Sequence, residues 1–215
     1  SLFCSAQTGG QIYKWDDETQ ERIEVSGEFN DLLAIDFQGD SLFYTTTSDT
    51  NTGALLKWDG SSHETITTQS EDGTLIRWPV DIAAGPQQDW FIADYNAGVV
   101  FHVDSTGTTQ ALSAGTNQPT AVFFHSDILY IGGDDGVYER PWPNGTTRKI
   151  DDRAAAGLTV IRETLIASGS PTGLFTVGGG ELGFDGPARF GAMLYLNEQI
   201  YVADRIGEGI WVATP

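Results

Sequence analysis

Four arginines are the residues of this 215-residue chain whose type and placement best suit ligand binding. The chain carries 30 Asp and Glu against 11 Lys and Arg, for a net charge of −19. Four of its arginines fall in Gly- or Pro-containing segments between predicted strands, namely Arg77, Arg153, Arg189 and Arg205. The guanidinium group is suited to bidentate recognition of carboxylate or phosphate. These positions predict an anion-binding surface. The alternative is purely structural: each arginine pairs with a nearby acid, among Asp72, Asp152, Asp185 and Glu208.

A second set of candidates consists of carboxylate and amide side chains near predicted strand ends. Its members are Asn30, Asp31, Asp81, Asn96, Asn117, Asp134 and Asp204. Oxygen ligands that converge from several segments can hold Ca²⁺, which makes Ca²⁺ the candidate cofactor. The alternative is that Asp and Asn end strands and form Asx turns. Asp94 and Asp204 are assigned to such a turn motif.

The sequence gives little support for a zinc site, a catalytic nucleophile or a disulfide. The histidines His63, His102 and His125 fall on different predicted turns and strands, so neither a histidine zinc site nor a His–Ser dyad is indicated. The one cysteine, Cys4, excludes an internal disulfide and a cysteine-based zinc site. No GxSxG nucleophile motif is present. Trp78 and Trp142, each beside a proline, are candidates for a stacking platform.

The acidic composition excludes two classes of partner. Nucleic acids and anionic membranes are bound through Lys and Arg, which are scarce here, and no apolar run reaches the ~18 residues of a membrane span. The charge favours solubility, with recruitment of a cationic partner as the alternative. The compartment is left open, with a secreted or extracytoplasmic location slightly favoured.

A repeat of short strands organises the whole chain. One strand, labelled B, recurs at 1–7, 41–47, 89–95, 128–134, 164–170 and 199–205, and a C strand follows it after a Gly-containing turn. A strands precede all but the first B strand, and D strands follow most C strands. Four antiparallel strands recurring at about 40 residues are typical of a propeller blade. A sandwich, a β-helix or tandem small domains explain the repeat less well.

The expected fold is therefore an all-β, six-bladed β-propeller with about four antiparallel strands per blade. It forms one domain over 1–215, with blades near 1–26, 27–69, 76–114, 117–152, 156–184 and 187–215. The first A strand and the last D strand are missing from the chain. We expect either an N-terminal extension upstream of Ser1 or a partner segment to close the ring, since sheets avoid unpaired edges.

Two stretches resemble known propeller families. The segment 183–212, with DGPARF and YVAD, resembles an NHL repeat. The segment 78–104 has the same order of a proline, an A strand and a B strand that ends in Ala-Asp. It is also similar to gluconolactonase (senescence marker protein)-like and strictosidine synthase-like propellers. The resemblance implies a ligand face made of D–A and B–C loops around a channel mouth, where it places Arg77, Trp78, Arg153, Arg189 and Arg205.

The leading prediction of function is a non-enzymatic binding module for a protein or a small anionic ligand on that face. The runner-up, implied by the gluconolactonase resemblance, is a Ca²⁺-dependent lactonase-like hydrolase that uses Asn30, Asp81 and Asp204. The resemblance is incomplete, because the Glu that this family supplies from its first A strand has no counterpart here. A third reading is a structural subunit of a larger assembly.

Calcium separates the first two functions in one measurement. A binding module should keep its melting temperature when Ca²⁺ or EDTA is added. A calcium-dependent hydrolase should melt higher with Ca²⁺ and lower with EDTA, because a ligand that binds only the native state stabilises it by mass action. A thermal-shift titration, with Mg²⁺ as the control ion, reads out the difference. A strong, Ca²⁺-specific rise would overturn the leading prediction.

Overall fold

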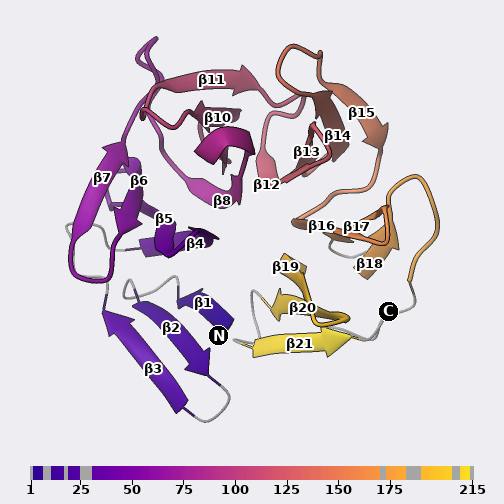
Figure 1. The fold of residues 1–215 in the computed structure, drawn as a ribbon. Coiled ribbons are helices and arrows are strands. Elements are labelled where there is room, and N and C mark those ends of the chain that lie inside the picture. The colour runs from indigo at the N-terminus through magenta and orange to yellow at the C-terminus, as the bar shows by residue number, and fades with distance from the viewer. Residues whose placement is uncertain are drawn as a thin grey trace. The chain divides into compact units, whose positions relative to one another are not determined.

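The structure, a computed structural model, describes residues 2–6, 11–16, 19–24, 31–169, 173–182, 190–204 and 209–213. By its internal contacts the chain divides into two compact units, Ser1–Leu112 and Ser113–Pro215, and each is described by itself. Figure 1 shows the strands, coloured from indigo at the N-terminus to yellow at the C-terminus. The expectation of one domain over 1–215 stays a prediction.

The first unit contains three antiparallel sheets in chain order. The first has three strands, β1 (Leu2–Ala6), β2 (Gln11–Asp16) and β3 (Thr19–Glu24). The second has four, β4 (Asp31–Gln38), β5 (Ser41–Thr47), β6 (Gly53–Trp58) and β7 (His63–Thr67). The third has four, β8 (Pro79–Ala84), β9 (Trp90–Asp94), β10 (Val99–Val103) and β11 (Thr109–Ser113), with a 3₁₀ turn at Pro86–Gln88.

The second unit continues the same pattern. One sheet has four strands, β12 (Pro119–His125), β13 (Ile128–Gly133), β14 (Gly136–Pro141) and β15 (Arg148–Asp151). Two have three strands: β16 (Gly157–Ile161), β17 (Thr164–Gly169) and β18 (Gly173–Thr176), then β19 (Phe190–Leu196), β20 (Gln199–Asp204) and β21 (Gly209–Ala213). Every sheet is an up-and-down meander, and the strands lie within a few residues of the positions expected from the repeat.

The expected fold class needs correction. A six-bladed propeller of about four strands per blade is wrong, because only three of the sheets have four strands and the others have three. The clearest departure follows β18, with which no fourth strand pairs among the described residues. There the described chain makes only an isolated bridge, Phe175 to Glu181, after a run of three glycines at 178–180. Glycine lacks the side chain that stabilises a strand through cross-strand pairs.

Three hairpins of the second unit, β12–β13, β16–β17 and β19–β20, use tight turns with two left-handed residues. The pairs are Ser126–Asp127, Arg162–Glu163 and Asn197–Glu198, all at φ between 47° and 63°. Two positive φ values match the type I′ turn, whose twist suits the right-handed twist of the flanking strands. Repetition of one turn gives the three hairpins the same register geometry.

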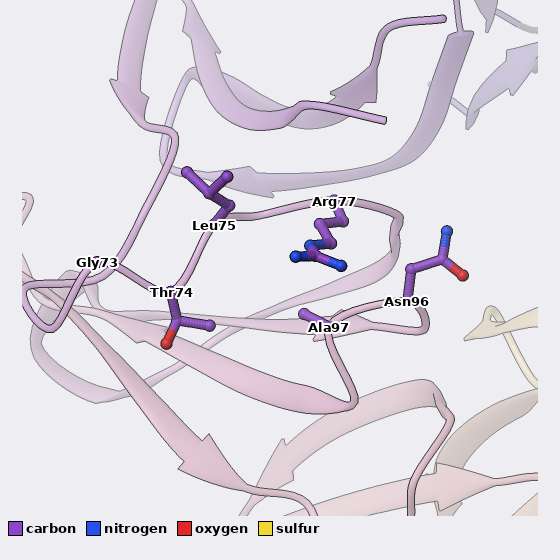
Figure 2. A pocket seen from close by; sticks show the side chains of 6 residues that line it. All are labelled: Gly73, Thr74, Leu75, Arg77, Asn96 and Ala97. Atoms are coloured by element: carbon purple, nitrogen blue, oxygen red, sulfur yellow. The ribbon is translucent and has the colours of Figure 1, made fainter. Parts of the chain in front are cut away.

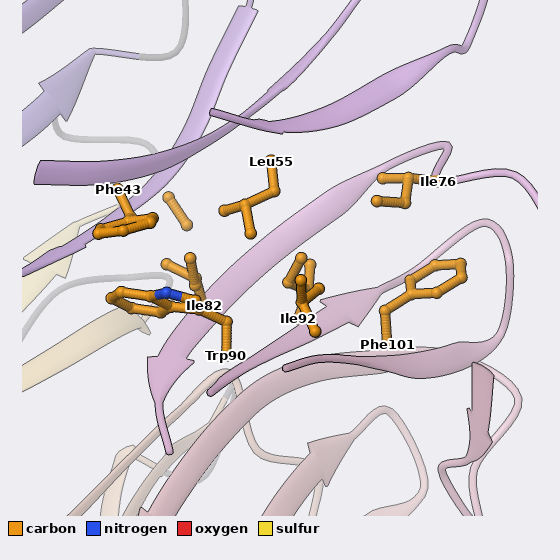
Figure 3. Close-up of a cluster of buried hydrophobic side chains, with 9 residues drawn as sticks. Phe43, Leu55, Ile76, Ile82, Trp90, Ile92 and Phe101 are labelled. Atoms are coloured by element: carbon orange, nitrogen blue, oxygen red, sulfur yellow. The ribbon is translucent and has the colours of Figure 1, made fainter. Parts of the chain in front are cut away.

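Each unit buries aliphatic and aromatic side chains between successive sheets. In the first unit Trp90, Ile92 and Phe101 pack with Phe43 and Leu55 of the preceding sheet (Figure 3). In the second unit one cluster joins Val137 to Phe175, and another joins Leu174 to Val202. In the part of the chain that the structure describes, no helix is long and apolar enough to span a membrane.

An ion pair links two sheets of the second unit. Arg153 donates from Nε and Nη2 to the two carboxylate oxygens of Asp151, at 2.9 and 2.6 Å, and from Nη2 to the carbonyl of Thr176. The guanidinium also lies 4.0 Å from the ring centroid of Phe175. Asp151 further accepts the backbone N–H of Gly178. Its hydrogen bond with Arg153 is the largest of the causes that hold its pKa well below the usual value.

This lowered pKa predicts how the ion pair responds to acid. A carboxyl with a lower pKa in the folded state stabilises the fold above its unfolded pKa of 3.8 and loses that contribution as the pH falls further. We therefore expect Asp151→Asn to be less stable than the parent chain near neutral pH, with the gap closing below about pH 3.8. Denaturant unfolding of both proteins from about pH 7 to about pH 3 measures it. A gap that stays constant over this range would contradict the assignment.

Candidate functional site

A buried carboxylate fixes the loops that carry the candidate site of the first unit. Asp94, at the end of β9, is fully buried. Its oxygens accept backbone N–H groups from Arg77 at 2.6 Å, from Trp78 at 3.1 Å and from Ala97 at 2.8 Å. Burial raises the pKa of Asp94, and these hydrogen bonds oppose the rise. The D–A loop before β8 and the B–C loop after β9 are thus held by one side chain.

The sheet formed by β4–β7 holds the same D–A loop from the other side. The hydroxyl of Thr47 donates to the carbonyl of Arg77 at 2.8 Å, and the N–H of Gly53 donates to the carbonyl of Ile76 at 2.8 Å. Ile76 itself is fully buried among the aromatic and aliphatic residues of the core. The backbone of residues 76–78 is therefore fixed along both sides, while the side chain of Arg77 is exposed.

A pocket of about 360 Å³ opens between these two loops. Figure 2 shows its lining, which comes from residues 73–75 and 77 of the D–A loop and 96–97 of the B–C loop: Gly73, Thr74, Leu75, Arg77, Asn96 and Ala97. The amide of Asn96 donates to the side-chain oxygen of Asn51 at 3.0 Å, which orients it beside the pocket. The lining combines a guanidinium, an amide and a hydroxyl with the exposed aliphatic side chain of Leu75.

The charge at this pocket is set by Arg77. Among the residues that the structure describes, no carboxylate forms a salt bridge with Arg77. Asp72, the acid expected to pair with it, instead accepts hydrogen bonds from the hydroxyl of Ser70 at 2.5 Å and the N–H of Thr74 at 3.0 Å. The hydrogen bond from Ser70 leads the causes that lower the pKa of Asp72. The side chain of Arg77 is exposed at the pocket and has no described acid as its partner.

The other predicted binding residues are placed differently. Trp78 lies beside Arg77, half-buried, and is not among the pocket-lining residues. Arg153 belongs to the second unit and pairs with Asp151, not with the expected Asp152, which lies 3.4 Å from Lys149. Arg189 and Arg205 lie outside the described residues. A shared arginine cluster at a channel mouth therefore stays a prediction.

Two of the candidate metal ligands lie on strands that belong to different units. Asp81 lies on β8 next to a register shift, and Asp204 ends β20. Asn30 lies outside the described residues. Asp81 and Asp134 both take part in interactions within the chain. Within the described residues no group of three or more His, Cys, Asp or Glu could hold a metal ion. A Ca²⁺ site stays a prediction.

The histidines have separate partners. His63 lies 2.8 Å from the hydroxyl of Tyr44, His102 lies 2.8 Å from Asp89, and His125 lies 3.6 Å from Glu163. Burial is the main cause that lowers the pKa of His63.

Comparison with known proteins identifies the fold. Neither a protein-family model nor a curated protein matches the chain. Among solved structures it is similar to a chain of a nidogen/laminin complex, at 12% identity and a TM-score of 0.78, covering 99% of this chain and 88% of that one. It is also similar to a candidate gluconolactonase, at 16% identity and a TM-score of 0.69, covering 94% and 80%.

A third similar structure is the extracellular domain of a candidate hybrid two-component system from B. thetaiotaomicron. The identity is 13%, the TM-score is 0.68, and the match covers 98% of this chain and 30% of that one. At such identities the likeness concerns the fold alone. Together with the meander sheets, these structures show that the chain is an all-β β-propeller.

The role of Asp94 can be tested by removing its carboxylate. Asp94→Ala leaves three backbone N–H groups without their acceptor, and an unsatisfied buried donor costs about 1–3 kcal/mol. We expect the free energy of unfolding to fall by about 2–4 kcal/mol, less than three full penalties because the charged group no longer has to be buried. Denaturant unfolding measures it. Asp49→Ala, at an exposed turn, is the control and should change little. Equal stability of the two variants would refute the role.

Proposed function

We propose that this propeller is a non-enzymatic binding module that engages an anionic group of a protein or small ligand. The pocket between the D–A and B–C loops of the first unit is the binding site, and Arg77 is its main anchor. Asn96 and Thr74 are the neutral hydrogen-bonding groups beside it. The sequence predicts a binding face made of several D–A and B–C loops, and the proposed site uses one loop of each kind.

The observation that carries the proposal is an exposed arginine on a fixed backbone. In a chain of charge −19 an exposed arginine has many acids to pair with, yet no described acid forms a salt bridge with Arg77. The backbone at 76–78 is already ordered by Asp94, Thr47 and Gly53, so binding would order only the side chain. A preorganised donor of this kind favours affinity, because less conformational freedom is lost on association.

The chemistry of the pocket supports binding over catalysis. The lining residues supply donors and an aliphatic contact, and none of the six is an acid, a histidine or a cysteine. General acid–base catalysis relies mostly on such groups, and a hydroxyl such as that of Thr74 needs an adjacent base to act as a nucleophile, which the six lining residues do not supply. The likeness to a chain of the nidogen/laminin complex is in keeping with a binding role, as one of several roles that this fold carries.

Capped amino acids give a direct test of the proposed site. We expect N-acetyl-aspartate amide to shift the side-chain NMR signals of Arg77 and Asn96 in a saturable manner, because a carboxylate accepts two guanidinium hydrogen bonds. The isosteric N-acetyl-asparagine amide should shift them far less. Arg77→Gln should abolish the response of Asn96.

A matched arginine elsewhere controls for general charge effects. Arg148 is also exposed, but its guanidinium contacts Glu139 at 2.6 Å. Arg148→Gln removes the same formal charge and should leave the response at Arg77 and Asn96 unchanged. Equal shifts with the aspartate and asparagine probes, or an Asn96 response that survives Arg77→Gln, would refute the proposed site.

A further inference from the structure

We propose that the outer edge of β21 is an acceptor site for an added β-strand from a partner polypeptide. The added strand would pair antiparallel with β21 and carry both basic and apolar side chains. The site lies in the second unit and does not depend on the Arg77 pocket.

The first observation is the exposure of β21. Ile210, Trp211 and Val212 are 42%, 43% and 49% exposed, although all three are large and apolar. The neighbouring strand β20 is less exposed, with Ile200 at 2%, Val202 at 0% and the residue between them half-buried. Exposure therefore rises sharply at the edge of the sheet. Among the described residues no strand pairs with the outer side of β21.

The other sheets show what this position looks like when it is covered. The second and third residues of β21 are Ile210 and Trp211. The second and third residues of the corresponding strands β6, β10, β14 and β18 are all at most 5% exposed: Ala54, Leu55, Val100, Phe101, Val137, Tyr138, Leu174 and Phe175. A fourth strand pairs with β6, β10 and β14, and the bridge at Glu181 lies against β18.

The exposed residues of β21 lie on both faces of the sheet. Trp211 is in register with Val202, whereas Val212 is in register with Tyr201, and successive residues of a strand point to opposite faces. A partner that packs on one face would leave the other residue uncovered. A strand added at the edge places side chains on both faces, and its backbone pairs with the free edge of β21.

The chemistry of the added strand follows from two further observations. The fourth strands already in the molecule, β7, β11 and β15, are short and mix apolar with polar side chains. Only β15 begins with two basic residues, and its Arg148 contacts Glu139 on the neighbouring strand β14. The net charge of −19 attracts a basic segment and repels a second copy of the chain. A basic strand from a different polypeptide is therefore the occupant we propose.

A peptide with a sequence close to that of β15 tests the site. The probe is the segment 146–152 with both aspartates replaced by threonine and both ends capped, TTRKITT. We expect it to shift the backbone amide NMR signals of 209–213 in a saturable manner. TTRKPTT should fail, because proline lacks the N–H that a ladder requires, and the acidic TTEEITT should bind more weakly.

Substitutions at two similarly exposed apolar side chains distinguish pairing at the β21 edge from nonspecific hydrophobic binding. Trp211→Ser should weaken TTRKITT binding by about tenfold or more, as the loss of a central aromatic contact does at interfaces. Leu194→Ser is the matched control, because Leu194 is 45% exposed but lies on β19, at the opposite edge of the sheet. It should leave the affinity unchanged.

Three outcomes would overturn the proposal. One is that the amides of 209–213 do not respond to TTRKITT. Another is that these amides are already protected from hydrogen exchange in the free monomer, which would mean that the chain covers its own edge. The third is that sedimentation finds a dimer that Trp211→Ser dissociates, which would make a second copy the occupant.

Discussion

The architecture of the first unit depends on the carboxylate of Asp94. Buried without a cationic partner among the described residues, it is compensated by backbone N–H groups from two loops that the β-ladders leave unpaired. A neutral amide side chain has one acceptor oxygen instead of two and could accept fewer of these bonds. The cost of burying a charge is thus offset by satisfying donors that would otherwise be buried unpaired. This exchange fixes the backbone at 77–78 and 97, and the pocket between the loops follows from it.

Asp94 and Asp151 are stabilised in opposite ways. In the first unit burial raises the pKa of Asp94, and its partners are backbone groups. In the second unit Asp151 has a lowered pKa, and its main partner is the guanidinium of Arg153. The guanidinium of Arg153 pairs with Asp151 and stacks near the ring of Phe175, so few of its donors remain for a ligand. Arg77 lies in a loop whose backbone is held by Asp94 and Thr47, and its exposed side chain forms no salt bridge with a described acid.

The positions of the strands and of the loop residues could be predicted from the sequence, because short-range patterns of apolar residues and turns determine them. Alternating apolar residues and Gly-containing turns located the strands, and Arg77 and Asn96 were identified as loop residues between them. The strand count per sheet was not predictable in this way, since glycines 178–180 weaken a pairing that the repeat spacing alone implies. The acid that pairs with Arg153 was predicted one residue away from the true partner. Which backbone groups remain unpaired at a strand end, and hence what Asp94 binds, is a property of the assembled sheets.

Asp94 binds main-chain atoms, whereas side chains line the pocket, and this separation affects how the site can evolve. The carboxylate holds main-chain atoms of residues 77, 78 and 97, and main-chain atoms are present whatever side chains those positions carry. Mutation at position 77 or 96 can therefore alter the ligand without disturbing the scaffold, provided that proline is avoided where an N–H is bound. Natural variants of this propeller would be free to diversify their ligands while Asp94 itself remained under strict purifying selection.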